Sequence, residues 1–307
     1  MIPKLEIIIV NWNSGELLSE CIHSIGNAVG NNFKLNKVVV VDNASIDNSL
    51  DNLIDADLPL EIIRNSQNLG FARACNLGAG ESRADYLLFL NPDTKLFSDS
   101  LSLPVNFLEK EENQGIGILG VKLLDENSNA NKNCARFPSA FNMSYMSFGL
   151  DRLFPKIFKP HFMFEWDHLS SREVDQVMGS FLLIRRELFQ SLGGYDERFF
   201  VYYEDLDLSF RAKQRGAQSY YLADAVIYHK GGGTTENVKA MRLFYLLRSK
   251  LLFARKHFTA AGYYPVLIFT FIPEFLIRIA ALLATGKIKA CGEVASAYSM
   301  LIRSLFK

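Results

Sequence analysis

Residues 38–45 read Val-Val-Val-Val-Asp-Asn-Ala-Ser, four β-branched residues followed at once by four small or polar residues. A strand with one face in water alternates apolar and polar residues, so a run that is apolar at every position predicts a strand buried on both faces. Sheets of this kind are covered by helices on each side. We therefore expect Val38–Val41 to be an inner strand of a parallel sheet, with Asp42 at its carboxyl end.

Comparable apolar runs alternate with helical segments along the first part of the chain. Strands that are apolar on both faces and separated by helices are typical of a doubly wound α/β domain. Ligands bind to such sheets at the carboxyl ends of the strands. The predicted strands are Leu5–Val10, Val38–Val41, Leu60–Ile63 and Tyr86–Leu90, and the predicted helices lie at 15–29, 45–54 and 70–80.

A second set of elements follows nearer the C-terminus. The apolar run Val177–Ile184 predicts a strand, and Gly193 and Gly194 end the short helix that comes after it. The predicted helices here lie at 186–192 and 209–215, and the predicted short strands lie at 219–222 and 225–228.

Composition limits the class of protein. The chain has 307 residues, 49% of them hydrophobic, and its 33 basic and 33 acidic residues leave no net charge. It is long enough for one large domain with an appendage or for two small domains, and it lacks the basic excess of a nucleic-acid-binding protein. The four cysteines form no C-x-x-C pair, which predicts reduced thiols in a cytosolic protein.

The C-terminal part contains a long apolar segment. Residues 263–285 have the length of a membrane-spanning helix, but Glu274 and Arg278 interrupt them. Because charges at mid-depth are costly, we expect a helix in the membrane interface or a helical hairpin rather than a span. The alternative is a helix packed on the protein's own core. Flanking cations that suit anionic headgroups are Arg248, Lys250, Arg255, Lys256, His257, Lys287, Lys289, Arg303 and Lys307.

Polar side chains mark the carboxyl ends of the first two predicted strands. Asn11 follows the first strand, and Asp42 and Asn43 follow the second. Asp42 has two interpretations. It caps the helix that comes next, or its carboxylate accepts hydrogen bonds from the base or ribose of a nucleotide.

The helix predicted at 70–80 begins with a glycine and an arginine. Gly70 lies at its mouth, Asn68 precedes it and Arg73 follows one turn in. An arginine near a helix N-terminus opposes the helix dipole unless an anion lies close by, and a diphosphate would be such an anion. The alternative is a solvent-exposed arginine without a ligand.

Asn91-Pro92-Asp93 follows the buried strand predicted at 86–90. A divalent cation that bridges phosphates needs hard oxygen ligands, and one or two carboxylates suffice because the phosphates supply the rest. Asp93 is the best candidate for such a ligand, and His229 is a candidate second ligand or phosphate contact. The alternatives are an Asx-turn at Asp93 and a satisfied polar group at His229.

Five acidic residues lie beside apolar runs in residues 179–208. Carboxylates next to a buried aromatic wall are where a general base is commonly made. Asp196 and Glu197 follow a Gly-Gly turn, and Glu204, Asp205 and Asp207 lie directly behind Phe199-Phe200-Val201-Tyr202-Tyr203.

Six of these segments, in this order, resemble family-2 glycosyltransferases of the GT-A fold. Within that family the chain is most similar to bacterial rhamnosyltransferases of surface polysaccharide and O-antigen assembly. The resemblance covers about residues 4–257, and six motifs together are far more specific than any one. The segments are Ile7–Asn13, Val39–Ser45, Asn68–Arg73, Phe89–Asp93, Gly179–Asp207 and His229–Gly233.

The resemblance implies an α/β fold and a domain organisation. The fold would be of GT-A, or Rossmann-like, type, with a mixed, mainly parallel sheet and helices on both faces. We expect this domain to span residues 1–257, with a nucleotide-binding half at 1–100 and an acceptor and catalytic half at 101–257. Residues 258–307 are expected to form a helical segment that associates with the membrane.

The resemblance also implies an inverting, metal-dependent hexosyl transfer from a nucleoside diphosphate sugar. Asp205 would be the catalytic base with Glu204 beside it. Asp93 would be the last residue of a DXD-type motif that binds Mg²⁺ or Mn²⁺, with His229 as a further ligand. The usual first Asp of that motif is Asn91 here, which predicts modest metal affinity. The predicted donor contacts are Asn11, Asp42, Asn43, Asn68, Gly70, Arg73 and Asn91.

The subgroup favours dTDP-L-rhamnose as the donor and a glycan on a polyprenyl diphosphate lipid as the acceptor. This predicts a cytoplasmic protein bound peripherally to the inner face of the bacterial cell membrane. One alternative is a UDP-galactofuranose or other UDP-hexose transferase. A nucleotidyltransferase would need a Gly-rich loop with a cation after the first strand, where residues 11–15 hold one glycine and no cation. A membrane-docked nucleotide-sugar-binding subunit without activity is the alternative from another class.

Overall fold

The computed structural model describes residues 2–51, 53, 58–231 and 238–306. It divides into two compact units. The first comprises residues 1–136, 162–197 and 204–234, and the second comprises residues 137–161, 198–203 and 235–307. The functional domain limits predicted at residues 100 and 257 stay a prediction.

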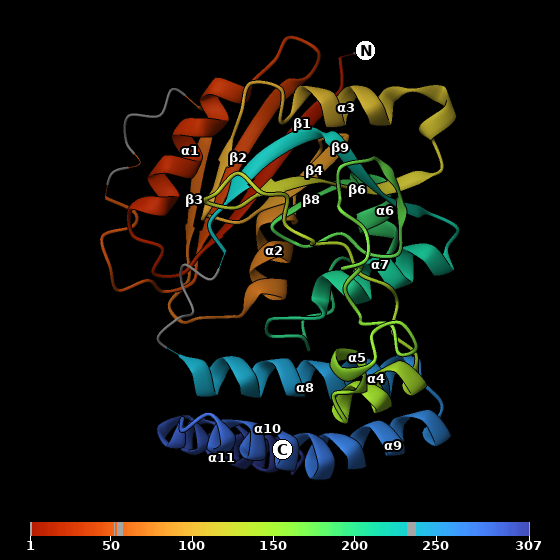
Figure 1. Ribbon diagram of the computed structural model, residues 1–307. Helices are drawn as coiled ribbons and strands as arrows, with labels where there is room; N and C mark the ends of the chain where they lie inside the picture. Colours follow the sequence, from red (N-terminus) through yellow and green to blue (C-terminus); the bar gives the residue numbers. More distant parts are fainter. Residues whose placement is uncertain (1, 52, 54–57, 232–237, 307) are drawn as a thin grey trace. The chain divides into compact units, whose positions relative to one another are not determined.

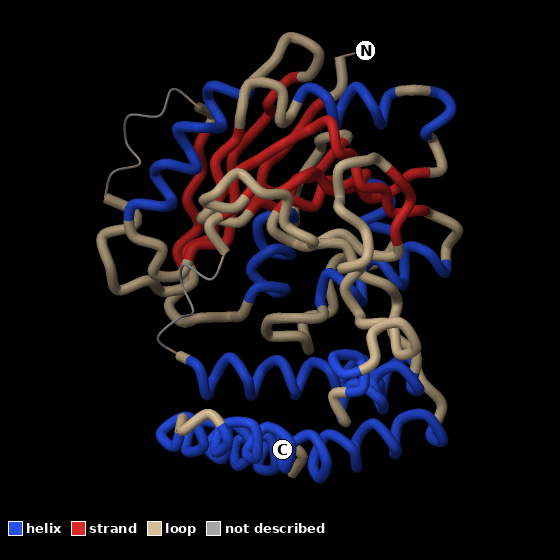
Figure 2. The backbone as a smooth tube through the Cα atoms, in the orientation of Figure 1, coloured by secondary structure: helices blue, strands red, loops and turns tan. Residues whose placement is uncertain are grey.

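The first unit is built around one mixed sheet, which has nine strands in the described residues (Figures 1 and 2). In chain order they are β1 (Lys4–Asn11), β2 (Lys34–Asp42), β3 (Leu60–Arg64), β4 (Tyr86–Leu90), β5 (Thr94–Leu96), β6 (Ile116–Leu124), β7 (Arg172–Val174), β8 (Phe181–Arg185) and β9 (Gln218–His229). Their order in space is β3-β2-β1-β4-β8-β6-β9-β5, and β7 pairs with β9. The strands β3, β2, β1 and β4 are mutually parallel, whereas β8 runs antiparallel to both β4 and β6.

Helices cover both faces of this sheet. On one face lie α1 (Glu16–Ala28) and α3 (Ser102–Glu109), and on the other lie α2 (Phe71–Ala79), α6 (Arg186–Ser191) and α7 (Glu204–Gln214). A 3-10 turn, Glu111–Asn113, follows α3. Successive side chains of β1 point to opposite faces, so Ile7 enters one core and Ile8 the other. The predicted α/β fold, a mixed, mainly parallel sheet with helices on both faces, is confirmed.

The helix predicted at 45–54 is wrong, because its described residues form bends and turns. Short polar side chains compete with a helix for backbone groups, and here they are committed elsewhere. Asp47 accepts a hydrogen bond from the Gly15 N–H at 2.8 Å, and the Ser45 hydroxyl accepts one from the Asn13 N–H at 3.0 Å. The segment is therefore tied to the loop after β1.

Three boundaries in the second set of elements also differ from prediction. The strand predicted at 177–184 begins at Phe181, and the strands predicted at 219–222 and 225–228 are parts of the single strand β9. The helix predicted at 209–215 begins at Glu204. This earlier start places the candidate catalytic carboxylates in the first turn of α7.

The second unit consists of helices in its described residues. They are α4 (Ala140–Ser147), α5 (Leu150–Leu153), α8 (Lys239–His257), α9 (Ala260–Phe269), the π-helical turn η2 (Thr270–Glu274), α10 (Phe275–Ala284) and α11 (Ile288–Ser304). We call the continuous stretch α9-η2-α10 the apolar run. It has 25 residues, its most apolar window has a mean hydropathy of 2.2, and only 11% of that window is buried. By length and composition alone, such a helix could cross a membrane.

An ion network within the second unit surrounds Glu274. Its carboxylate accepts hydrogen bonds from Lys250 Nζ on α8 at 2.8 Å and from Arg278 at 2.7 Å, and Lys250 also donates to the Ser147 hydroxyl at 2.9 Å. Burial by itself would raise the pKa of Glu274. The charges and hydrogen bonds of Lys250 and Arg278 outweigh burial and hold that pKa below its ordinary value.

We expect Glu274→Gln to destabilise the protein at neutral pH by about 3 kcal/mol, because the buried Lys250 ammonium loses its counter-charge. Since the folded pKa of Glu274 is depressed, its contribution to stability is present above the unfolded pKa, about 4.3, and is lost as the pH falls through the lower folded value. Thermal melts of wild type and variant should therefore converge in the acid range.

Lys239→Met is the control, because it removes an exposed cation from α8, the helix that also carries Lys250. Its melting temperature should equal that of the wild type. A gap between Glu274→Gln and wild type that stays constant with pH would contradict the ionic role of Glu274.

Candidate active site

The parallel pairing of strands brings three predicted site segments to one edge of the sheet. Asn11 at the end of β1 lies opposite Asp42 at the end of β2, and Ile9 lies opposite Leu90, the last residue of β4. The turn that contains Asp93 therefore starts beside the ends of β1 and β2. This is the edge at which α/β sheets bind their ligands.

Asn11 and Asp42 form the centre of a buried polar network. The Asn11 amide donates hydrogen bonds to Asp42 Oδ1 at 2.8 Å and to the Ser49 hydroxyl at 2.8 Å, and its carbonyl oxygen accepts one from the Ser14 hydroxyl. Asn11 is fully buried. It therefore orients Asp42 from within the protein, and its predicted contact with a donor stays a prediction. Sequence analysis did not identify Ser14 or Ser49, whose only signal was the cluster of short polar residues after each strand.

Asn43, Asn68 and Gly70 form the N-terminal mouth of α2. The Asn43 amide donates to the Gly70 carbonyl at 3.1 Å, and the Gly70 N–H donates to Asn68 Oδ1 at 2.9 Å. Gly70 has a φ of 84°, which a residue with a Cβ rarely adopts. Arg73 in the first turn is exposed and lies 3.6 Å from Glu197. Such an exposed ion pair is weak, so an incoming diphosphate could replace Glu197.

Asp93 and His229 lie together at the same edge. The strand β5 pairs Thr94 with His229, and this register places His229 Nε2 3.3 Å from Asp93 Oδ1. The Asn91 carbonyl accepts a hydrogen bond from the Thr94 hydroxyl at 2.7 Å, which closes the turn. Two residues that are far apart in sequence are thus in contact. Gly232 and Gly233 of the predicted motif lie outside the described residues.

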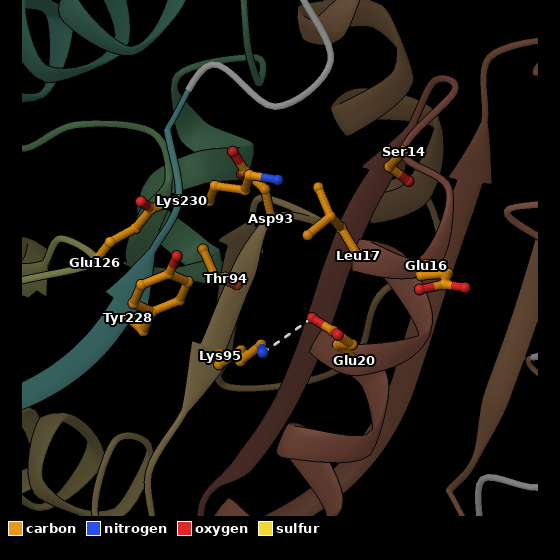
Figure 3. A pocket seen from close by; sticks show the side chains of 10 residues that line it. All are labelled: Ser14, Glu16, Leu17, Glu20, Asp93, Thr94, Lys95, Glu126, Tyr228 and Lys230. Atoms are coloured by element: carbon orange, nitrogen blue, oxygen red, sulfur yellow. Dashed lines mark ion pairs between the residues drawn. The ribbon is translucent and has the colours of Figure 1, made fainter.

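A cavity of about 490 Å³ lies next to Asp93. Figure 3 shows its lining side chains from α1, the Asp93 turn and β9. Its volume falls in the range of small-molecule sites. No group of three or more His, Cys, Asp or Glu side chains in the described residues could hold a metal ion. A cation bound by Asp93 and His229 would therefore depend on phosphate oxygens for its remaining ligands.

Asp205 is linked to the end of β4 through two backbone groups. The Gly179 N–H donates to Asp205 Oδ2 at 3.0 Å, and the carbonyl of the next residue, Ser180, accepts a hydrogen bond from the Asn91 N–H at 3.0 Å. The candidate base is therefore held near the strand end that leads into Asp93. Gln176 also hydrogen-bonds Asp205 through its side chain, a contact that sequence analysis missed.

Glu204 and Asp205 differ in their surroundings. Burial raises the pKa of both carboxyls, and the neighbouring Asp205 raises that of Glu204 further. Hydrogen bonds from the Leu206 and Gly179 N–H groups and from Gln176 oppose this for Asp205, because they stabilise the ionised form. One carboxyl oxygen of Glu204 is buried without a hydrogen-bond partner in the described part of the chain. Asp205 is therefore the carboxyl that ionises more easily.

Two other acidic residues of this region have structural partners. Asp207 is fully buried and lies 2.7 Å from Arg211, which donates to the carbonyls of Leu192 and Gly194. Glu197 accepts a hydrogen bond from Asn76 at 3.1 Å and pairs with Arg73 as described above. These contacts hold α7 and the Gly-Gly turn in place.

The strand order and the polar strand ends are those of a GT-A protein, the class of α/β proteins to which nucleotide-sugar transferases belong. Residues 6–193 match Glycosyl transferase family 2, so the chain belongs to this family. The predicted family and fold are thereby confirmed.

Relatives and solved structures agree with this assignment. The chain is 27% identical over 247 residues to N-acetylglucosaminyl-diphospho-decaprenol L-rhamnosyltransferase of Mycobacterium tuberculosis, a match that covers 76% of this chain and 78% of that protein. It is 31% identical over 140 residues to rhamnosyltransferase WbbL of Escherichia coli, covering 45% and 49%. The mannosyltransferase PcManGT from Pyrobaculum calidifontis, solved in complex with GDP-Man and Mn²⁺, superposes with a TM-score of 0.58 at 16% identity, covering 98% of this chain and 88% of that one.

We expect Glu204→Gln to raise the free energy of unfolding at neutral pH by about 1 kcal/mol or more, because burial and Asp205 disfavour the ionised carboxyl in the folded protein and the amide does not ionise. Since the folded pKa of Glu204 is raised, the wild type loses stability as the pH rises past the unfolded value, about 4.3. The advantage of the variant in thermal melts should therefore grow from acid to neutral pH. The exposed Glu173→Gln is the control and should show no such trend. A less stable Glu204→Gln protein at neutral pH would refute this account.

Proposed function

We propose that the chain transfers a sugar from a nucleoside diphosphate donor to an acceptor hydroxyl with inversion at the anomeric carbon. The observation that carries the proposal is the hydrogen-bonded link from Asp205 through Gly179 and Ser180 to Asn91. It holds a carboxylate near the turn that contains Asp93. An inverting transfer needs a base and a leaving-group site on opposite sides of one sugar, and this link supports the assignment of the two roles to Asp205 and the Asp93 turn.

The chemistry needs one proton transfer and one bond exchange. The acceptor oxygen attacks the anomeric carbon while the bond from that carbon to the diphosphate oxygen breaks, and the electron pair of that bond leaves with the diphosphate. Asp205 takes the proton of the acceptor hydroxyl. Its hydrogen bonds from Gly179 and Leu206 favour the ionised form that this step needs, against the burial that raises its pKa. Glu204, whose pKa is raised by burial and by Asp205, would position the base.

The donor would lie along the strand ends. Asp42 would accept hydrogen bonds from the base or ribose, supported by its fixed orientation on Asn11. The mouth of α2 would contact the nucleotide through Asn43, Asn68 and Gly70, with Arg73 and Asn91 toward the diphosphate.

A divalent cation, Mg²⁺ or Mn²⁺, fits the residues present. One carboxylate and one imidazole beside a cavity would hold it through Asp93, His229 and the oxygens of the donor diphosphate. When bound it neutralises the charge that develops on the leaving diphosphate. The Mn²⁺ in the PcManGT complex supports this proposal.

We propose L-rhamnose from dTDP-rhamnose as the transferred sugar and a glycan on a polyprenyl diphosphate lipid as the acceptor. The support is the Mycobacterium tuberculosis relative, whose name specifies L-rhamnosyl transfer to N-acetylglucosaminyl-diphospho-decaprenol. Such an acceptor would place the enzyme peripherally on the cytoplasmic face of the cell membrane. A UDP-hexose such as UDP-galactofuranose is the alternative donor. Diphosphate release from a panel of nucleotide sugars distinguishes these donors.

We expect Asp205→Asn to lower the transfer rate about a hundredfold or more, because an amide cannot take the acceptor proton. Donor binding, measured by calorimetry, should stay within error of the wild type. Asp224→Asn, at an exposed carboxylate of β9, is the control and should keep full activity. If Asp205→Asn kept most of its turnover, another group would have to be the base.

We expect a chelator to abolish transfer and added Mn²⁺ to restore it. Asp93→Asn should raise the Mn²⁺ concentration needed for half-maximal activity about tenfold or more, because it removes the proposed carboxylate ligand. Loss of a group that only supports a metal ligand already lowers metal affinity about tenfold. Glu126→Gln alters another carboxylate that lines the same cavity and should leave the Mn²⁺ requirement unchanged. Full activity of the wild type in excess chelator would rule out the metal.

A further inference from the structure

The apolar run presents two different faces within the second unit. Val266 and Thr270 are fully buried. Glu274, four residues after Thr270, lies on the same face and takes part in the ion network. Residues two positions apart lie about 200° around a helix, so the positions offset by two form the opposite face. That face is an exposed apolar stripe made of Tyr264, Ile268, Ile272 and Leu276, which are 58%, 50%, 57% and 58% exposed.

The C-terminal segment that contains the stripe has more basic than acidic residues. Residues 258–307 carry five basic residues against two acidic ones. One of the two acidic residues, Glu274, is already paired with Lys250 and Arg278. The exposed cations after the apolar run are Lys287, Lys289 and Arg303. An exposed apolar stripe in a segment with excess basic residues suits the surface of an anionic lipid bilayer.

The ion network decides how the apolar run can meet that bilayer. Glu274 is hydrogen-bonded to Lys250 of α8, and α8 packs against α9 and α11. A spanning run would draw α8 into the hydrocarbon together with its exposed cations Lys239, Arg242 and Arg255, at a high cost. A run that lies in the membrane plane keeps the network on its protein side and presents only the stripe to lipid.

We infer that the apolar run is an in-plane membrane helix that inserts its Tyr264–Leu276 stripe at the boundary between headgroups and acyl chains of an anionic bilayer. This deepens the proposed membrane location and rests on the proposed function only for the lipid-linked nature of the acceptor. Lipid binding itself requires neither a donor nor catalysis.

Flotation of the full-length protein with vesicles tests whether the stripe binds a lipid bilayer. Binding should be stronger to vesicles that contain phosphatidylglycerol than to pure phosphatidylcholine. Ile268→Ser and Ile272→Ser should each weaken binding about tenfold, because each removes a large apolar side chain from lipid. Leu169→Ser changes an exposed leucine of the first unit and should have no effect. If the stripe variants bound vesicles as strongly as the wild type, the inference would be overturned. If the wild type bound both kinds of vesicle equally, the role of the cations would be overturned.

Asp205→Asn separates this inference from the proposed function. The variant should float like the wild type even where transfer is lost, so failure of catalysis and failure of docking give different results.

Cysteine labelling distinguishes an in-plane helix from a span. Cys21, Cys75 and Cys134 are buried, so a Cys291→Ser background leaves few reactive thiols. Ala261→Cys and Thr285→Cys place probes at exposed positions at the two ends of the apolar run. A membrane-impermeant maleimide should label both from the same side of sealed membrane vesicles. Labelling from opposite sides would show a span and overturn the inference.

Discussion

The parallel pairing of β1 with both β2 and β4 is the constraint on which the rest of the site depends. Parallel strands end at the same edge, so the register that sets Asn11 opposite Asp42 also sets the Asp93 turn beside them. A shift by one residue would exchange the β1 side chains between the two cores, which are packed for particular residues, and would separate these polar ends. Packing in the two hydrophobic cores therefore helps to position the polar residues of the candidate site.

Glu274 and Glu204 have opposite pKa shifts because their neighbours differ in charge. Glu274 has two cationic partners, and its pKa is lowered. Glu204 has a carboxylate as its neighbour, and its pKa is raised. The first arrangement joins two helices, whereas the second costs stability next to the candidate base. Tyr202 and Tyr203, directly before Glu204, have φ values of 67° and 69°, a strained conformation for bulky residues. Backbone strain and a buried carboxyl oxygen without a hydrogen-bond partner in the described residues thus lie next to each other along the chain, as expected for a functional site.

Sequence patterns predicted the buried strands well because four consecutive apolar residues have one stable environment in a folded chain. They failed where short polar residues had several possible partners. Residues 45–51 resemble a helix start, yet Ser45 and Asp47 bond to the loop after β1. The predicted helix at 209–215 omitted the acidic first turn of α7, because those residues are buried by tertiary packing and not by local periodicity. Gln176 gave no local signal at all.

From the sequence alone, the α/β class, the family and the identities of the polar residues at the strand ends could be determined, because each is written in local pattern and motif order. Tertiary structure alone decided which of these residues touch. The contact of Asp93 with His229, the link from Asp205 to Asn91, and the pairing of Glu274 with Lys250 all join residues distant in sequence. Such contacts depend on strand register and helix packing, which no local pattern encodes. For the same reason, only the structure showed that Glu274 and Arg278, the charges within the apolar run, pair with each other and that Glu274 also pairs with Lys250.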